Sequence, residues 1–494
     1  MHYTISCEDT AAHYLRVELI IAGVATAEVE LQLPAWRPGR YELAHFAKNI
    51  QQFDVFDGQD QSLPFRKITK DRWQVSTGGA TEVVVRYAYY ARQRDAGGSW
   101  LDETQVTINF INCLVYAEGR LNEACQVRLR IPENYRIACG LAEKARVLSA
   151  KDYYQLVDSP VLASADLQHE KYQVGRSTFH LWLWGNVRPD WPRIKTDFDR
   201  FTRKQMAVMS GSQPPCFPSD DYHFILQFLP IQHYHGVEHH NSTVIVLGPD
   251  AEFETWYDDL LGISSHELFH AWNVIRIRPA ELMPYDFTRE NYFPTGFVAE
   301  GVTTYYGDLF LKRSGVWGLE TYLTELNRTL KRHFNLHGRA VHSLVESSFD
   351  LWLDGYQPGV PDRKVSIYHK GAVVALILDL EIRQQTGHVR SLDDVMRGMW
   401  QNFGQPQVGY TLEDYRAAVE GATGHFPPGI APQNTVQAYF DECITGNAPL
   451  ENRLNRALNF VGLEWKANES EMTLQLQENY TVAQRENLSK WLDE

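Results

Sequence analysis

The chain has 494 residues, enough for about three domains of ordinary size and an ample core. Hydrophobic residues make up 44% and charged residues 22%, which excludes a mainly disordered chain. The net charge of −15 and the lack of a basic block argue against a nucleic-acid partner. Six scattered cysteines form no C-x-x-C pair, so the sequence favours a reducing compartment over a disulfide scaffold or a cysteine zinc ribbon.

The sequence carries no recognisable targeting or membrane segment. The N-terminus lacks a basic region followed by an apolar run. The longest early apolar stretch, residues 19–25, is too short to span a bilayer. We therefore expect a cytoplasmic protein without a membrane partner.

The first 165 residues follow the two-residue period of β-strands. Val83, Val85, Tyr87 and Tyr89 repeat the period of two, and apolar and polar side chains alternate at 127–131, with turn-forming residues between such runs. Strands with one apolar face predict an N-terminal antiparallel β-sandwich-like domain over residues 1–165. Further strands are expected at 179–184, 224–229 and 243–247.

Helical patterns fill most of residues 255–444. Three possible capping boxes open helices there, at Thr255 with Asp258, Ser391 with Asp394 and Thr411 with Asp414. Strands followed by helices predict an α+β multidomain protein and not alternating βαβ units. A mainly helical domain over 166–450 and a short C-terminal part over 451–494 complete the predicted organisation.

The segment His266-Glu267-Leu268-Phe269-His270 contains an H-E-x-x-H motif inside a helix predicted near 256–274. Residues four apart share one helix face, so both imidazoles can bind one Zn²⁺ while Glu267 reaches an adjacent water. A catalytic zinc needs a third protein ligand, and Glu300 in the next predicted helix can supply it. The alternative is a chance motif, with packed or solvated histidines and a Glu300 that only favours a helix N-terminus.

The residues around this motif resemble a known family, the glycyl aminopeptidases (metallopeptidase family sixty-one, within the gluzincins). The resemblance covers nearly the whole chain and is densest at 33–41, 266–274, 276–282, 289–292 and 300–301. It implies a thermolysin-like, mainly helical zinc peptidase domain over 166–450. It also implies that His266, His270 and Glu300 bind one Zn²⁺ per chain, with Glu267 as the general base.

The segment before residues 243–247 resembles the element of this family that recognises the substrate N-terminus. The resemblance implies that Gly236 and Glu238 belong to the substrate site and that Glu238 binds the free α-amine. It also implies that the strand at 243–247 edges the cleft and pairs with the substrate backbone. A separate metal site is the rival interpretation, because four histidines cluster here: His233, His235, His239 and His240.

A third element, Tyr368-His369-Lys370-Gly371, resembles the family's Tyr-x-Lys-Gly segment. The resemblance implies that the Tyr368 phenol donates a hydrogen bond to the tetrahedral oxyanion. Without the resemblance, a tyrosine before an apolar helix is more often a packing residue.

These features together predict a zinc aminopeptidase that removes small N-terminal residues, Gly or Ala, from peptides with a free N-terminus. A related endopeptidase, a zinc hydrolase of non-peptide substrates and a catalytically idle binding or scaffold protein stay open. The sequence leaves the oligomeric state open. Family members usually carry a PDZ-like unit near the C-terminus, but only about fifteen residues separate the flanking segments here, too few for a domain.

Overall fold

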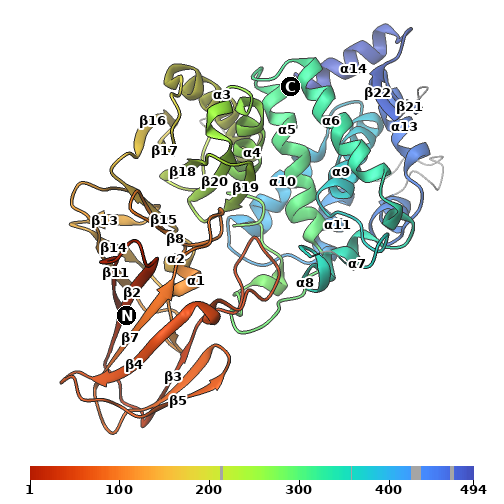
Figure 1. Cartoon of the computed structure of the whole chain (residues 1–494). Coiled ribbons are helices and arrows are strands. Elements are labelled where there is room, and N and C mark those ends of the chain that lie inside the picture. The colour runs from red at the N-terminus through yellow and green to blue at the C-terminus, as the bar shows by residue number, and fades with distance from the viewer. Residues whose placement is uncertain (212–214, 358, 424–435, 468–471, 494) are drawn as a thin grey trace.

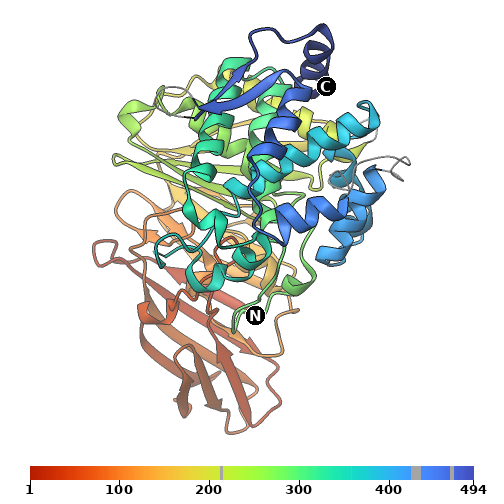
Figure 2. The same ribbon diagram turned by 90° about the vertical axis from the view of Figure 1, so that its right-hand side faces the viewer.

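The computed structural model describes residues 1–211, 215–357, 359–423, 436–467 and 472–493. The β-rich N-terminal part lies at one end of an elongated molecule, and the C-terminal helix lies at the other (Figures 1 and 2). The architecture is α+β, with an N-terminal β-rich part followed by a sheet and many helices. Among the described helices, none combines the length and apolar composition of a membrane span.

The N-terminal part is built on three sheets. The largest has the order β13-β14-β11-β1-β2-β7-β4. Its strands are β1 (His2–Ser6), β2 (Tyr14–Ala22), β4 (Ile50–Asp57), β7 (Glu82–Tyr90), β11 (Cys125–Arg130), β13 (Ala142–Lys144) and β14 (Val147–Ala150). One of the smaller sheets contains β3 (Glu28–Gln32), β5 (Phe65–Thr69), β6 (Arg72–Ser76) and β10 (Tyr116–Ala117). The other contains β8 (Trp100–Leu101), β9 (Val106–Ile108), β12 (Arg136–Ala138) and β15 (Val161–Ser164).

The alternating patterns form strands as predicted. In β11, Cys125, Val127 and Leu129 are buried while the intervening residues face solvent. In β7, the predicted apolar face (Val83, Val85, Tyr87 and Tyr89) is buried. Val84 and Ala88 on the opposite face are buried too, so this strand is covered on both sides. The sheet is not wholly antiparallel, because β1 pairs with β11 in parallel.

The second half begins with a five-stranded mixed sheet of order β16-β17-β18-β20-β19. Its strands are β16 (Gln168–Val174), β17 (Ser177–Trp184), β18 (Asp221–Phe228), β19 (His233–Glu238) and β20 (Ser242–Gly248). Helix α3 (Trp191–Ser210) connects the parallel strands β17 and β18. This βαβ unit departs from the predicted absence of such units.

The expectation that residues 243–247 form the edge strand is wrong. Strand β20 pairs with β18 on one side and with β19 on the other. The short hairpin from β19 to β20 adds β19 outside β20, so β19 is the edge. The unpaired backbone edge therefore belongs to the strand that carries Gly236 and Glu238.

Helices make up most of the remaining chain. They are α4 (Tyr257–Phe269), α5 (Thr303–Arg313), α6 (Leu319–Phe334), α7 (Leu344–Phe349), α8 (Leu351–Asp354), α9 (His369–Thr386), α10 (Leu392–Met399), α11 (Leu412–Thr423), α12 (Val436–Tyr439), α13 (Glu451–Phe460) and α14 (Val482–Leu492). The predicted capping boxes at Ser391 and Thr411 form. The one at Thr255 does not, because α4 starts after Trp256 without a side-chain cap.

Strands β21 (Leu463–Ala467) and β22 (Met472–Leu476) form an antiparallel hairpin between α13 and α14. The predicted place of the missing PDZ-like unit falls in this region, where residues 468–471 lie outside the described part. The domain boundaries at residues 165 and 450 stay predictions.

The N-terminal part is anchored to the helical part through Trp36. Its indole is fully buried, donates a hydrogen bond to Asp286 O at 2.8 Å, and meets the ring of Trp352 edge-on at 5.0 Å. The backbone N–H of Ala35 donates to Phe287 O at 2.8 Å. The loop that follows Trp36 is thereby held against the second half of the chain.

Helix α14 buries Trp491 against α5. The Trp491 indole is fully buried and donates to the Tyr305 hydroxyl at 2.9 Å, and Arg313 Nε donates to the Trp491 carbonyl at 3.0 Å. We expect Trp491→Ala to lower the free energy of unfolding by about 3–5 kcal/mol, because a large buried side chain is lost. Chemical denaturation followed by circular dichroism measures this.

Val482→Ala, at an exposed position of the same helix, is the control and should leave the unfolding midpoint unchanged. Equal unfolding midpoints for the Trp491 variant and the unaltered protein would contradict the packing of α14 on α5.

Candidate active site

Helix α4 places His266 and Glu267 in its last turn, and His270 directly follows its end. The helix is shorter than the predicted range near 256–274, because Ala271 and Trp272 donate to the carbonyls three residues back and Ile275 to the carbonyl five residues back, which breaks the regular α-helical pattern. The Nε2 atoms of His266 and His270 still converge, at 3.0 Å from each other. The predicted one-face arrangement of the two imidazoles is therefore present.

Glu300 lies in a π-helical turn, η4 (Phe297–Val302), that leads directly into α5. Its Oε2 lies 3.7 Å from His266 Nε2 and 3.4 Å from His270 Nε2. Three ligands of a tetrahedral zinc, each about 2.0–2.1 Å from the ion, lie about 3.3 Å from one another. The two imidazoles and the carboxylate thus have the chemistry and spacing of a zinc donor set.

Burial and neighbouring charge act in opposite directions on Glu300. Its side chain is 3% exposed, which by itself would raise the pKa of the carboxyl. The adjacent His270 and His266 outweigh burial and lower the pKa to about 2. Glu300 therefore stands as a carboxylate, the form that binds a cation.

Asn273 joins the end of α4 to the turn that carries Glu300. Its carbonyl oxygen contacts His270 Nδ1 at 2.6 Å, which leaves Nε2 of that ring to face Glu300. Its side-chain Nδ2 donates to Val298 O at 2.8 Å and to Thr303 Oγ1 at 3.1 Å. The fully buried Asn273 thus orients His270 and holds the turn that carries Glu300, the third predicted ligand.

The carboxylate of Glu267 faces the edge strand β19. A Cβ added to Gly236 would lie 2.3 Å from Glu267 Oε1, so the glycine leaves the room that this carboxylate occupies. Glu267 Oε2 is buried and has no hydrogen-bond partner among the described residues. Burial raises the pKa of Glu267 well above its usual range, which suits a group that must accept a proton.

Glu238 closes β19 and is buried beside the same group of residues. Its carboxylate, that of Glu267 and a ring nitrogen of His270 all lie within 4.8 Å of one another. Burial raises the pKa of Glu238. Gly39, from the loop after Trp36, has a positive φ of 74°, and a Cβ there would meet Glu238 Oε2 at 2.8 Å.

Tyr368 immediately precedes α9 and lines the same cleft as His266 and Glu267. Helix α9 approaches η4 closely, because a Cβ on Gly301 would lie only 2.4 Å from Gly371 Cα. Burial and the charge of Glu300 raise the pKa of Tyr368 well above its usual range, so the phenol keeps its proton.

The four clustered histidines do not gather at one point. His233 and His235 share one face of β19, with ring centroids 6.4 Å apart. His239 and His240 lie beyond the end of that strand and line a different pocket. Among the described residues, no group of potential metal ligands includes any of the four.

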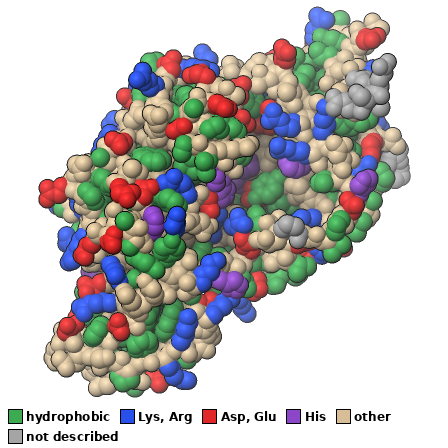
Figure 3. Space-filling model, in the orientation of Figure 1, with side chains coloured by type: hydrophobic (Ala, Val, Ile, Leu, Met, Phe, Trp, Pro, Cys, Tyr) green, Lys and Arg blue, Asp and Glu red, His purple; other side chains and the backbone are tan. Residues whose placement is uncertain are grey.

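A cleft of about 870 Å³ is lined by Gly236, His266, Glu267 and Tyr368. Glu238, His270 and Glu300 lie buried next to these residues. Figure 3 shows this face of the molecule hollowed, with histidine and hydrophobic side chains on the walls of the hollow. The cleft is also lined by Arg37, Gly39 and Tyr356, to which sequence reasoning assigns no role. The resemblance of segment 33–41 to the family could have indicated Arg37 and Gly39 as cleft residues. No feature of the sequence indicates Tyr356.

Two family profiles match the chain. Residues 2–165 match the Peptidase M61 N-terminal domain, and residues 259–374 match M61 glycyl aminopeptidase. Together they cover more than half of the chain. The chain is a peptidase. It belongs to the M61 glycyl aminopeptidase family.

Solved structures agree with this assignment. An aminopeptidase N family protein from Idiomarina loihiensis is 28% identical, has a TM-score of 0.85, and the match covers 94% of this chain and 79% of that chain. An M1 zinc metallopeptidase from Deinococcus radiodurans shares the fold, with 12% identity, a TM-score of 0.53, and coverage of 91% and 94%. A variant of that peptidase has been solved with a Tyr-Ser-Ala substrate. None of the curated proteins matched the chain.

The contact between Gly236 and Glu267 can be tested directly. We expect Gly236→Ala to abolish most peptidase activity while the fold is retained, because the new methyl group must displace the Glu267 carboxylate. Gly262→Ala on α4 is the matched control, since its methyl group would meet Trp317 at an ordinary 3.6 Å. Full peptide cleavage by the Gly236 variant would contradict a catalytic position for Glu267.

Proposed function

We propose that this chain is a zinc-dependent aminopeptidase that releases small N-terminal residues, Gly or Ala, from peptides. The observation that carries the proposal is the convergence of His266 Nε2, His270 Nε2 and Glu300 Oε2 beside the buried Glu267. These three residues would hold one Zn²⁺ per chain. When bound, the ion would polarise the scissile carbonyl and lower the pKa of the attacking water.

Glu267 has the position and the protonation behaviour of a general base. Its unpartnered Oε2 would take a proton from the attacking water and deliver that proton to the leaving amine. Its raised pKa supports both transfers, since the carboxyl then holds the proton between them. The Tyr368 phenol would donate a hydrogen bond to the oxyanion that develops on the carbonyl oxygen.

Glu238 would select for a free N-terminus. It is a buried carboxylate at the end of the edge strand, beside the general base, so a substrate ammonium would gain a charge-assisted hydrogen bond there. A blocked or internal segment would leave that buried carboxylate without a partner. The unpaired edge of β19, including Gly236, would pair with the substrate backbone. The family's description as glycyl aminopeptidase supports the preference for Gly, and the preference for Ala rests on the sequence resemblance alone.

We expect about one zinc per chain by elemental analysis and cleavage of glycyl and alanyl p-nitroanilides that a chelator abolishes and added zinc restores. Glu267→Gln should retain the zinc and lose turnover by a factor of at least about 10², because general acid–base catalysis contributes that much. A variant that keeps both zinc and turnover would exclude Glu267 as the base. Chelator-resistant cleavage would exclude the metal mechanism.

The role of Glu238 predicts discrimination against blocked substrates. The unaltered protein should cleave alanyl peptides much faster than their N-acetyl forms. Glu238→Gln should reduce this preference by about 10–100-fold, since a charged hydrogen bond contributes roughly 1.5–3 kcal/mol. Comparable kcat/KM values for free and acetylated peptides in the unaltered protein would instead identify an endopeptidase.

A further inference from the structure

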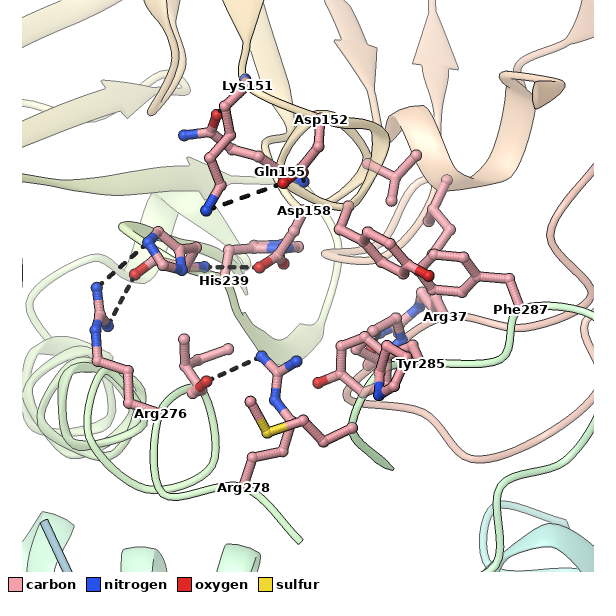
Figure 4. A pocket seen from close by; sticks show the side chains of 18 of the residues that line it. Arg37, Lys151, Asp152, Gln155, Asp158, His239, Arg276, Arg278, Tyr285 and Phe287 are labelled. Carbon is pink, nitrogen blue, oxygen red and sulfur yellow. Dashed lines mark hydrogen bonds and ion pairs between the residues drawn. The ribbon is translucent and has the colours of Figure 1, made fainter. Parts of the chain in front are cut away.

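A second pocket lies beside the active-site cleft, where the N-terminal part meets the segment that follows α4 (Figure 4). Its volume is about 330 Å³. One wall comes from residues 151–158, around the short helix α2 (Tyr153–Val157), and the opposite wall comes from residues 275–287. Arg37 lines both this pocket and the cleft, but none of the proposed zinc ligands lines the pocket.

Positive charge collects in this pocket although the chain as a whole carries a net charge of −15. Four cationic side chains line it, namely Arg37, Lys151, Arg276 and Arg278, against two carboxylates, Asp152 and Asp158. Both carboxylates already have other partners. Asp158 accepts hydrogen bonds from His239 Nδ1 at 2.9 Å and from the backbone N–H of His240 at 3.0 Å.

Asp152 caps helix α2 by accepting the backbone N–H of Gln155 at 2.7 Å, with Lys151 Nζ 3.9 Å away. None of the three arginines forms a close ion pair within the described ranges, and only more distant carboxylates act on them, Asp95 and Glu238 on Arg37 and Asp158 on Arg276.

Two of these arginines are deeply buried. Arg37 is 6% exposed and Arg276 is 7% exposed, and their hydrogen bonds to backbone go to neutral carbonyl oxygens. Burial lowers the pKa of Arg37, and it lowers that of Arg276 to about 10. Arg278 donates from Nη2 to Ile275 O at 2.9 Å, while its buried Nε has no partner among the described residues. Buried cations without a close counterion are unfavourable, so an anionic ligand in contact with them would stabilise this arrangement.

His239 supplies a further polar group. Its side chain is 5% exposed, and Nε2 has no hydrogen-bond partner in the described structure, because Asp158 binds only the other ring nitrogen. In Figure 4 the His239 ring and the Arg278 guanidinium face the centre of the pocket from opposite sides. Tyr285 and Phe287 form an aromatic wall next to them, with the Arg278 guanidinium 4.3 Å from the centre of the Tyr285 ring.

We propose that this pocket binds a small organic carboxylate. The carboxylate accepts hydrogen bonds from Arg278 and from Nε2 of His239 in its imidazolium form, in which Nδ1 donates to Asp158. The apolar body of the ligand packs against Tyr285 and Phe287. A bidentate guanidinium contact suits a carboxylate, and the aromatic wall favours an organic acid over a bare inorganic anion. A free acid and the C-terminal carboxylate of a peptide offer the same group, so the experiment separates the two.

The test is isothermal titration of the full-length protein with phenylacetate, with its neutral counterpart phenylacetamide, and with inorganic phosphate. Acetyl-Gly-Phe represents a peptide C-terminus, and its blocked amine keeps it from the proposed Glu238 subsite. Each titration is repeated after chelator treatment, because carboxylates also bind zinc. Binding is measured without turnover, so the outcome does not depend on the proposed aminopeptidase activity.

We expect phenylacetate to bind with and without chelator, and phenylacetamide and phosphate to bind at least about tenfold more weakly. Arg278→Gln should weaken phenylacetate binding about 10–100-fold. Lys151→Gln, at an exposed lysine on the rim, should weaken it by a smaller factor without risk to folding. Arg176→Gln, at an exposed arginine outside the pocket, is the matched control and should have no effect.

Stronger binding of acetyl-Gly-Phe than of phenylacetate would identify a peptide C-terminus as the ligand. Three results would each overturn the proposal: no binding of either carboxylate, binding that chelation abolishes, or phenylacetate binding that Arg278→Gln leaves unchanged.

Discussion

The candidate site depends on the buried contacts of Asn273. The backbone carbonyl of this residue orients His270, and its side-chain amide holds the turn that carries Glu300. Helix α4 and the η4–α5 helix come from segments separated by a long irregular connection, so no helical periodicity relates them. The Asn273 contacts, together with the hydrogen bond from Ser265 Oγ to Gly307 O between α4 and α5, fix the distance of the carboxylate from the two imidazoles. Every functional role proposed for the cleft presupposes that distance.

Close backbone approach is the second constraint on the site. The Gly236 backbone lies against the Glu267 carboxylate, and the Gly39 backbone lies against the Glu238 carboxylate. Gly301 and Gly371 let η4 and α9 touch, which brings Tyr368 to the same cleft as Glu267. In each case a side-chain methyl group would occupy the space of a functional group or of the backbone that positions it.

The N-terminal part contributes to both pockets through one loop. Trp36 anchors the loop in the second half of the chain. Arg37 and Gly39, on either side of Pro38, then lie against different groups of residues. Gly39 contacts Glu238, while Arg37 lines the cleft and the neighbouring cationic pocket. Glu267 lines the cleft with Glu238 and Glu300 buried nearby, and Arg276 and Arg278 line the neighbouring pocket, so one short segment lies between the carboxylate cluster and these arginines.

The sequence by itself determined the local features. The two-residue period of 125–130 specifies a strand because alternate side chains face the core, and H-E-x-x-H brings His266 and His270 together because a helix repeats every 3.6 residues. Residue types also determined the chemistry that Glu267, Glu300 and Tyr368 can supply. Strand order and helix ends depend on partners distant in the chain. Only the tertiary structure could therefore decide that β19 and not β20 is the edge, that α4 stops at Phe269, and that Arg37 stands between two pockets.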